Sequence, residues 1–419
     1  MQETAVAAGE EGDVPDLLPG GWKSDEERHA LLAKCANGTP EEERVEALCC
    51  IREKALLPAH LTTLWEDEEL CLALLACAEP PDPDFGKNPF AEEEPDPPTD
   101  LVRTLAVTIF ACLATCEENR HPMAKDFDLR HVIASAALDV DRPILLRERA
   151  VLLLGSLALA GGCFDPSDDG VPTEPPSPTT CEECGCCPCV CKAGDKVWLN
   201  EDIHICHGLA VGLGKEVSSF LRAKTLGILC SMATASTLDA SRLWRNRRIR
   251  TAVIDTCDVN ETEEVRVAAL EALWAFSACD LLQEGLWAEA KVRNTLLKAA
   301  EGSKEVNGAL FQQSVDIRGR ALRALANLAT SLNNQRTMWC NQHLSLVLLE
   351  AVSAGGIVRA DAMDVLVELS KNWTNRPGMV AAGLSNLFRA AADDEGLQSD
   401  ERRNCQFACE RLAAAVECS

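Results

Sequence analysis

Six cysteines within eleven residues are the densest group of reactive side chains in the sequence. They stand in CxxC and CxC spacings, and two histidines follow downstream: the group is Cys181, Cys184, Cys186, Cys187, Cys189, Cys191, His204 and His207. Thiolates at these spacings can reach one metal ion through a tight turn, and Zn²⁺ or Cu(I) favours sulfur ligands in tetrahedral or lower coordination. The group is therefore a candidate zinc or copper site. A redox-active cysteine loop and an unstructured cysteine-rich insertion are the alternatives.

Five arginines lie within nine residues of a chain that is otherwise acidic. They surround a tryptophan, and the group is Arg242, Trp244, Arg245, Arg247, Arg248 and Arg250. Clustered guanidinium groups with Trp244 available for stacking could bind a phosphate, an acidic peptide or RNA. We expect the run to precede a helix. The alternative is internal neutralisation by the acids at 255–264 or 92–94.

The sequence carries no motif of a known catalytic centre. Gly212-Leu-Gly214-Lys215 lacks the upstream glycine and the following Ser or Thr of a phosphate loop. Neither HExxH nor a nucleophile elbow occurs, and nothing orients His204 or His207 toward a cysteine nucleophile. We therefore expect a protein without enzyme activity and without a resident cofactor, apart from the zinc or copper discussed above.

Composition narrows the class of partner. The 419 residues include 66 acids against 40 bases, for a formal charge of −26, and this charge repels phosphate backbones. Aromatic residues are only 4% and tyrosine does not occur, so the stacking platforms of single-stranded nucleic-acid binders are missing. Hydrophobic residues make up 47%, which is enough to form a folded core. We expect a protein or peptide partner, most simply a basic one, and no nucleic acid.

Cysteine use and the N-terminal sequence point to a reducing compartment. Most cysteines outside the cluster replace small apolar residues within helical patterns, where a free thiol packs as a small hydrophobe. The first residues have neither a basic segment nor a long apolar run, as a signal peptide would. The longest uncharged stretch, residues 150–164, is shorter than the roughly 20 residues of a membrane-spanning helix. We expect a cytoplasmic or nuclear protein without a membrane span.

One pattern recurs along the chain. It is an arginine followed by a small residue at +3, apolar residues at +4, +7 and +10, and Ala or Ser at +11. These offsets fall within an arc of about 120° at about 100° per residue, so each copy predicts one amphipathic helix. Full copies begin at Arg103, Arg147, Arg222, Arg266, Arg318 and Arg359, and weaker ones at Arg44 and Arg402. We call these residues the opening arginines.

From Arg103 onward, neighbouring copies are 41 to 52 residues apart, except for 75 residues from Arg147 to Arg222. Several copies are followed by Asn at +16 and Met at +20, as in Asn119/Met123, Asn334/Met338 and Asn375/Met379. A third helix then follows, predicted at 131–138, 292–300, 344–352 and 384–391. Each unit is thus two or three helices in roughly 40 to 47 residues.

These repeats resemble those of armadillo and HEAT-type proteins over about residues 40 to 418. The segment Arg318-Gly-Arg-Ala-Leu-Arg-Ala-Leu-Ala-Asn-Leu-Ala carries the likeness most clearly. The resemblance implies that the opening arginine commonly pairs with an acid of a neighbouring repeat, and Asp141 lies six residues before Arg147. The resemblance also implies a concave, partner-binding face, which we expect the third helices to line. Import receptors and catenins carry an asparagine on this inner face in successive repeats, and only Asn327 matches it here.

We therefore predict an all-α fold, a right-handed α-solenoid of seven to nine armadillo/HEAT-like repeats with two loop insertions. Residues 1–22 form a disordered acidic tail, and residues 23–418 form the repeat domain. An acidic, Pro-rich insertion at 79–100 and a Pro/Cys-rich insertion at 161–195 interrupt it. The second insertion accounts for the 75-residue spacing.

The leading functional interpretation is a monomeric, non-catalytic scaffold or adaptor that binds a protein or extended peptide along the concave face. One alternative is a metal- or redox-responsive regulator that acts through the cysteine-rich loop at 181–191. Another is an import-type adaptor for basic peptides.

Metal content separates the scaffold from the metal-responsive regulator. A plain scaffold predicts no stoichiometric metal in protein purified under reducing conditions, as measured by elemental mass spectrometry. A variant with Ser at all six cysteines of the cluster is the control. About one equivalent of zinc or copper, lost in this variant, would instead support a metal site.

Overall fold

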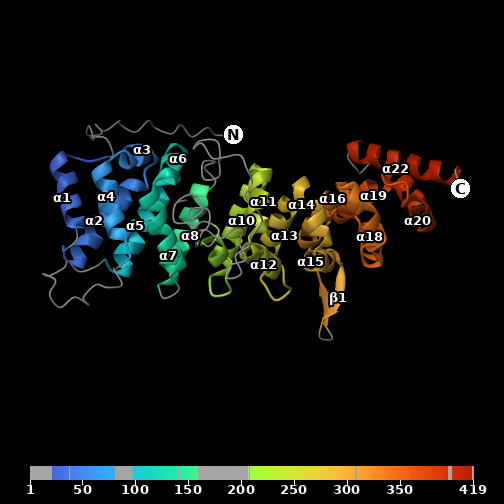
Figure 1. The fold of residues 1–419 in the computed structure, drawn as a ribbon, viewed down its shortest axis with the longest axis horizontal. Coiled ribbons are helices and arrows are strands. Elements are labelled where there is room, and N and C mark those ends of the chain that lie inside the picture. Colours follow the sequence, from blue (N-terminus) through green and yellow to red (C-terminus); the bar gives the residue numbers. More distant parts are fainter. Residues whose placement is uncertain are drawn as a thin grey trace, which may run out of the picture. The chain divides into compact units, whose positions relative to one another are not determined.

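The computed structural model describes residues 21–36, 38–80, 98–139, 142–158, 206, 208–306, 309–394 and 399–417 (Figure 1). Helices account for nearly all regular structure in these ranges, as predicted. None of these helices is both long and apolar enough to span a bilayer. The chain divides into two compact units, residues 1–170 with 201–208 and residues 171–200 with 209–419, which are described separately.

The described helices of the N-terminal unit are α1 (Asp25–Cys35), α2 (Glu41–Ala55), η1 (Pro58–His60), α3 (Leu61–Trp65), α4 (Glu68–Ala78), α5 (Asp100–Leu113), α6 (Glu117–Lys125), α7 (Phe127–Leu138) and α8 (Ile144–Ala158). Those of the C-terminal unit are α10 (Ser219–Ala235), α11 (Thr237–Arg245), α12 (Arg247–Asp255), α13 (Glu263–Ser277), α14 (Asp280–Ala288), α15 (Ala290–Ala300), α16 (Val315–Thr330), α17 (Leu332–Trp339), α18 (Gln342–Ala354), α19 (Gly356–Ser370), α20 (Arg376–Ala381), α21 (Leu384–Ala392) and α22 (Ser399–Glu417).

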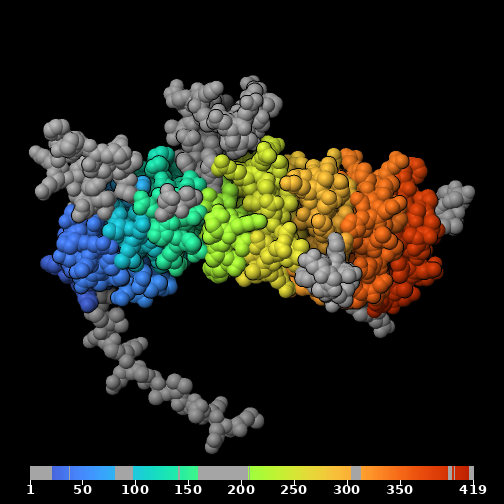
Figure 2. Space-filling view, turned by 90° about the horizontal axis from the view of Figure 1, so that it is seen from below, coloured from blue at the N-terminus to red at the C-terminus, as the bar shows by residue number. Residues whose placement is uncertain are grey.

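Every opening arginine lies in a helix, as predicted. The helices that carry them are long and pack side by side in sequence order: α2, α5 and α8 in the N-terminal unit, and α10, α13, α16 and α19 in the C-terminal unit. In α16 the predicted apolar stripe, from Ala321 to Ala329, is completely buried. Figure 2 shows the C-terminal helices as consecutive bands of surface from green to red.

The predicted third helices are also present. They are α7, α15, α18 and α21, and each includes nearly the whole range expected from the sequence. However, the long helices pack against one another much more extensively than the third helices do. The continuous row of the C-terminal unit is therefore built by the long helices and not by the third helices.

Four of the long helices, α5, α10, α13 and α16, begin at a polar cap four residues before the opening arginine. Thr99, Ser218, Thr262 and Ser314 each accept a hydrogen bond from the backbone N–H three residues on, at 3.2 to 3.4 Å. Such caps satisfy an N–H group that the first helical turn leaves open. The cap fixes where each helix starts, and with it the face on which the arginine lies.

The opening arginines are largely buried and reach toward the next repeat. Arg222 Nη1 lies 2.6 Å from Glu261 Oε2, and Arg359 Nη1 lies 3.0 Å from Asp394 Oδ2. These two pairs match the acid partners that the repeat resemblance implied, but Arg103 instead donates from Nε to the Ala78 carbonyl of the preceding repeat at 3.2 Å. Arg266 differs, because its Nη2 donates to the neutral Gln313 Oε1 at 2.8 Å. Glu261 and Gln313 each lie five residues before the next opening arginine, so they occupy equivalent positions.

The recurring asparagines hold successive repeats together. Asn334 Nδ2 donates to the Leu328 carbonyl at the end of α16 and to the Gln283 carbonyl of the preceding repeat, both at 3.0 Å. Asn119 and Asn375 make the same pair of bonds, each to the carbonyl six residues earlier and to one in the repeat before. All three side chains are buried. We call them the bridging asparagines.

A two-stranded antiparallel hairpin adds to the helical fold. Strands β1 (Ser303–Val306) and β2 (Ala309–Gln312) pair with Ser303 opposite Gln312, between α15 and α16. The hairpin accounts for the 52-residue spacing between Arg266 and Arg318. Sequence analysis did not predict this third insertion.

Two predicted domain boundaries shift in the structure. Trp22 is buried and lies under Lys54, whose Nζ is 5.0 Å from the ring centroid, so the fold already includes the end of the predicted 1–22 tail. Helix α5 begins at Asp100, inside the predicted 79–100 insertion. Residues 1–20, 81–97 and the whole of 161–195 lie outside the described residues.

Removing a bridging asparagine tests this arrangement. We expect Asn334→Leu to lower the free energy of unfolding by about 1–3 kcal/mol, because two buried carbonyls lose their donor. Urea titration followed by circular dichroism measures this loss. The neighbouring, exposed Asn333→Leu is the control and should change stability by about 0.5 kcal/mol or less. Equal effects of the two changes would show that the bridge does not stabilise the stack.

Candidate partner-binding surfaces

The structure divides the predicted arginine cluster between two helices. Arg242 and Arg245 belong to α11, and Arg247, Arg248 and Arg250 belong to α12. Asn246 separates them and caps α12 by accepting from the N–H groups of Arg248 and Ile249. The run therefore begins in one helix and continues into the third helix of its repeat, where sequence analysis expected it only to precede that helix.

Trp244 is a core residue, and the expectation that it is available for stacking on a ligand is wrong. Its side chain is 5% exposed, and its ring contacts Phe276 at a centroid distance of 5.1 Å. Arg250 Nε lies 3.7 Å from Glu289 Oε1, a partner that was not among the predicted acids. Arg245, Arg247 and Arg248 are exposed. What remains of the predicted site is an exposed basic edge without an aromatic platform.

The predicted metal ligands lie outside the described residues, from Cys181 through Cys191 to His204 and His207. Within the described part of the chain, no group of three or more His, Cys, Asp or Glu side chains is arranged to hold a metal ion. The cysteines of that part are free thiols. Burial raises the pKa of the Cys257 thiol to about 12, so this cysteine is an unreactive packing residue at neutral pH.

The α10, α13, α16 and α19 row has one exposed side, which carries Phe220, Glu264, Asp316 and Ile357. We call it the ladder face. It contains a hollow of about 400 Å³ lined by Glu263, Glu264, Glu271 and Asp316, with Lys224 as the one base. We call this the acidic hollow. Arg320 Nη2 approaches Glu271 Oε1 at 3.7 Å and borders the hollow on the α16 side.

Apolar side chains flank the acidic hollow at matching helix positions. The residue two before the opening arginine is Phe220 in α10 and Ile357 in α19, and these side chains are 55% and 52% exposed. In the two helices between them, the same position is Glu264 and Asp316. The ladder face thus presents an apolar, acidic, acidic, apolar series, one residue per repeat.

In the N-terminal unit this position is apolar in α5 and α8, whereas in α2 it is the exposed acid Glu42. Leu101 in α5 and Leu145 in α8 hold the same position and are 53% and 52% exposed. Large apolar side chains that recur at one exposed position are more informative than scattered ones, because they lie in a row. In the sequence, the row appears as a large apolar residue two positions before the opening arginine, and this position was not among the predicted site residues.

Asn327 was the only match to the inner-face asparagines of import receptors. Its Nδ2 donates to the Trp274 carbonyl at 3.2 Å and to Ser277 Oγ at 3.1 Å, so both of its amide hydrogens bond the neighbouring helix α13. Asn327 therefore ties two ladder helices together. A row of asparagine amides that clamps a peptide backbone does not form at this position.

Comparison with known proteins supports the fold. No family model matches the sequence, and no curated protein sequence matches it either. Among solved structures, UNC-45 from Drosophila melanogaster aligns over 94% of this chain and 52% of its own length, with a TM-score of 0.51 and 10% identity. The chain therefore spans about half the length of UNC-45.

Two kinds of designed protein also align. A computationally designed armadillo repeat protein for modular peptide recognition covers 51% of this chain and 84% of its own, with a TM-score of 0.43 and 17% identity. Another designed armadillo repeat protein covers 71% and 98%, with a TM-score of 0.45 and 14% identity. Together with the stacked three-helix units, the alignment to UNC-45 establishes an armadillo-type helical repeat fold for this chain.

Proposed function

We propose that this protein is a non-catalytic interaction scaffold that binds a basic segment of a partner protein on the ladder face. The observation that carries the proposal is the acidic hollow with an exposed apolar side chain in register on each side. This series of side chains lies on helices whose opposite sides are buried against neighbouring helices. Its exposed side chains are therefore free to contact a partner.

The spacing of the helices on the ladder face determines which peptide could bind there. Packed helices lie about 8–10 Å apart, and an extended chain advances about 3.3 Å per residue, so roughly three residues correspond to one repeat. Two basic side chains could then reach Glu264 and Asp316, with apolar side chains at each end near Phe220 and Ile357. The partner is accordingly an extended peptide with two Lys or Arg residues about three positions apart, and with an apolar residue about three positions beyond each of them.

Electrostatics favours this partner over an acidic one. The hollow has four carboxylates against the single ammonium group of Lys224, whose Nζ lies over the Phe220 ring at 5.4 Å. In addition, the chain as a whole carries a formal charge of −26, which attracts basic segments at low ionic strength. The mechanism is binding alone, with no bond made or broken.

Charge reversal in the hollow tests the proposal. A labelled peptide of the above design should bind the full chain in a fluorescence anisotropy titration, and the double variant Glu264→Lys/Asp316→Lys should weaken binding by at least about tenfold, because two attractive contacts become repulsive. A peptide with Glu in place of the basic pair should not bind the unchanged protein.

The matched control is Glu284→Lys/Asp393→Lys, which makes the same change of net charge at exposed positions outside the ladder helices. This variant should lose affinity only slightly. Equal weakening by both variants would reduce the effect to net charge, and failure of any basic peptide to bind would contradict the proposal.

A further inference from the structure

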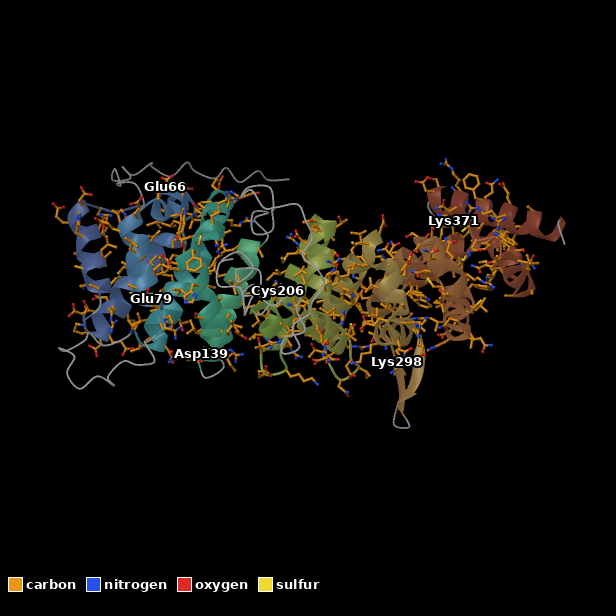
Figure 3. All side chains as sticks on the ribbon, in the orientation of Figure 1. Glu66, Glu79, Asp139, Cys206, Lys298 and Lys371 are labelled. Atoms are coloured by element: carbon orange, nitrogen blue, oxygen red, sulfur yellow. The ribbon has the colours of Figure 1, made fainter. Side chains whose placement is uncertain are left out.

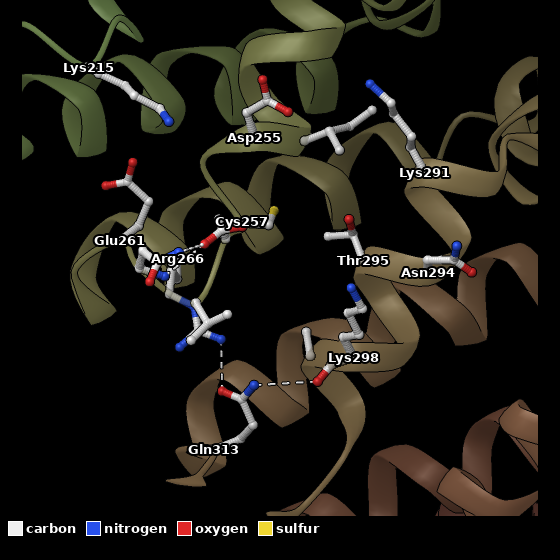
Figure 4. Close-up of a pocket in the computed structure, with 15 residues that line it drawn as sticks. Lys215, Asp255, Cys257, Glu261, Arg266, Lys291, Asn294, Thr295, Lys298 and Gln313 are labelled. Atoms are coloured by element: carbon white, nitrogen blue, oxygen red, sulfur yellow. Dashed lines mark hydrogen bonds between the residues drawn. The ribbon is translucent and has the colours of Figure 1, made fainter. Parts of the chain in front are cut away.

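A second pocket lies in the C-terminal unit, at the ends of its helices and apart from the residues of the acidic hollow. It has a volume of about 560 Å³ and is bordered by the loop before α10, the end of α12, the start of α13, and α15 (Figure 4). Four basic residues line it: Lys215, Arg266, Lys291 and Lys298. We call it the cationic pocket.

The three lysines of this pocket have no acceptor among the residues that the structure describes. None of their ammonium groups forms an ion pair or a hydrogen bond with another described residue. Figure 4 shows the Lys298 ammonium directed toward the middle of the pocket, with those of Lys215 and Lys291 near its rim. Asn294 and Thr295 add neutral donors on the same wall. The pocket therefore has several hydrogen-bond donors to offer a ligand.

Most of the carboxylates that line the pocket already accept hydrogen bonds from other residues of the chain. Glu261 Oε2 accepts from Arg222 Nη1 at 2.6 Å, and Asp258 Oδ1 accepts from the backbone and side chain of Asn260 at 2.9 and 2.7 Å. Asp255 is the remaining carboxylate in the lining. Two of the three acids thus already have donors, whereas the lysines have no acceptors in the described part of the chain.

Arg266 forms the buried part of the pocket wall. It is 4% exposed and donates to Gln313. Gln313 occupies the position that Glu261, the partner of Arg222, holds in the preceding repeat. Burial lowers the pKa of Arg266, so a nearby anion would stabilise its charged form. Because Gln313 is neutral, it does not repel a bound anion as a carboxylate at that position would.

We infer that the cationic pocket binds a phosphate ester. A doubly charged phosphoryl group with three acceptor oxygens suits three ammonium groups drawn from two elements, and a pocket of this volume also accommodates the organic group that the phosphate carries. The ester is either a small phosphorylated molecule or a phosphorylated side chain of a protein. This inference does not depend on the peptide partner proposed for the ladder face.

Calorimetric titration of the full chain with inorganic pyrophosphate at low ionic strength tests the pocket. Saturable binding is expected, and Lys291→Ala/Lys298→Ala should weaken it by at least about tenfold, since charge-assisted hydrogen bonds are lost. Asp255→Asn should strengthen binding, because it removes the carboxylate whose charge opposes the anion.

Lys371→Ala is the control for loss of positive charge, because Lys371 and Lys298 lie at opposite edges of the C-terminal unit (Figure 3). It should leave affinity unchanged. No saturable binding, or no difference between Lys371→Ala and the double variant, would overturn the inference.

Two competitors identify the source of the phosphate. Glycerol 3-phosphate represents a small ester, and an alanine-rich peptide with one phosphoserine represents a phosphorylated protein. The competitor that displaces pyrophosphate at the lower concentration indicates the source. If neither displaces it, the pocket does not recognise a phosphate ester and the inference is wrong.

Discussion

Buried backbone carbonyls between repeats need side-chain donors, which the three bridging asparagines supply, and this constraint organises the rest of the structure. The carbonyl that ends a long helix would be buried without a donor if the bridging asparagine did not reach it, and the same amide also binds the preceding repeat. An unpaired buried carbonyl costs about 1–3 kcal/mol, which is a large share of the stability of a small helical unit. Repeats must therefore stack in one register, and stacking in turn buries the apolar stripe of every long helix.

Fixed stacking also determines what remains available for function. With one side of each long helix buried, the opposite sides form the ladder face, and residues at the same helix position follow one another at the spacing of a repeat. Function then depends on which residue occupies a given position in each repeat. Glu264 and Asp316 make the middle of the ladder acidic, whereas Phe220 and Ile357 keep its ends apolar. A change of residue at one repeat position also matters at the helix ends. There Gln313 stands beside Arg266 in place of an acid, and it lines the cationic pocket.

The fold was largely predictable from sequence, because helical periodicity and buried arginines recur at fixed offsets. The hairpin at 303–312 was missed, although the Asn-Gly dipeptide at 307–308 is a common hairpin signal. The partner surfaces were predicted less well. Trp244 looked like part of a binding site because its neighbours are charged, but its helix turns it into the core against Phe276. The acidic hollow and the cationic pocket combine residues from successive repeats, so they exist only once the stacking register is known.

The central claim is that the ladder face selects its partner through the acidic hollow and its apolar flanks. Selection of peptides from a random library on the full chain tests this claim without assuming a ligand sequence. The account predicts that enriched peptides contain two Lys or Arg residues about three positions apart between apolar residues, and that the Glu264→Lys/Asp316→Lys protein no longer retains them. Enriched peptides that lack basic residues, or that bind both proteins equally well, would contradict it.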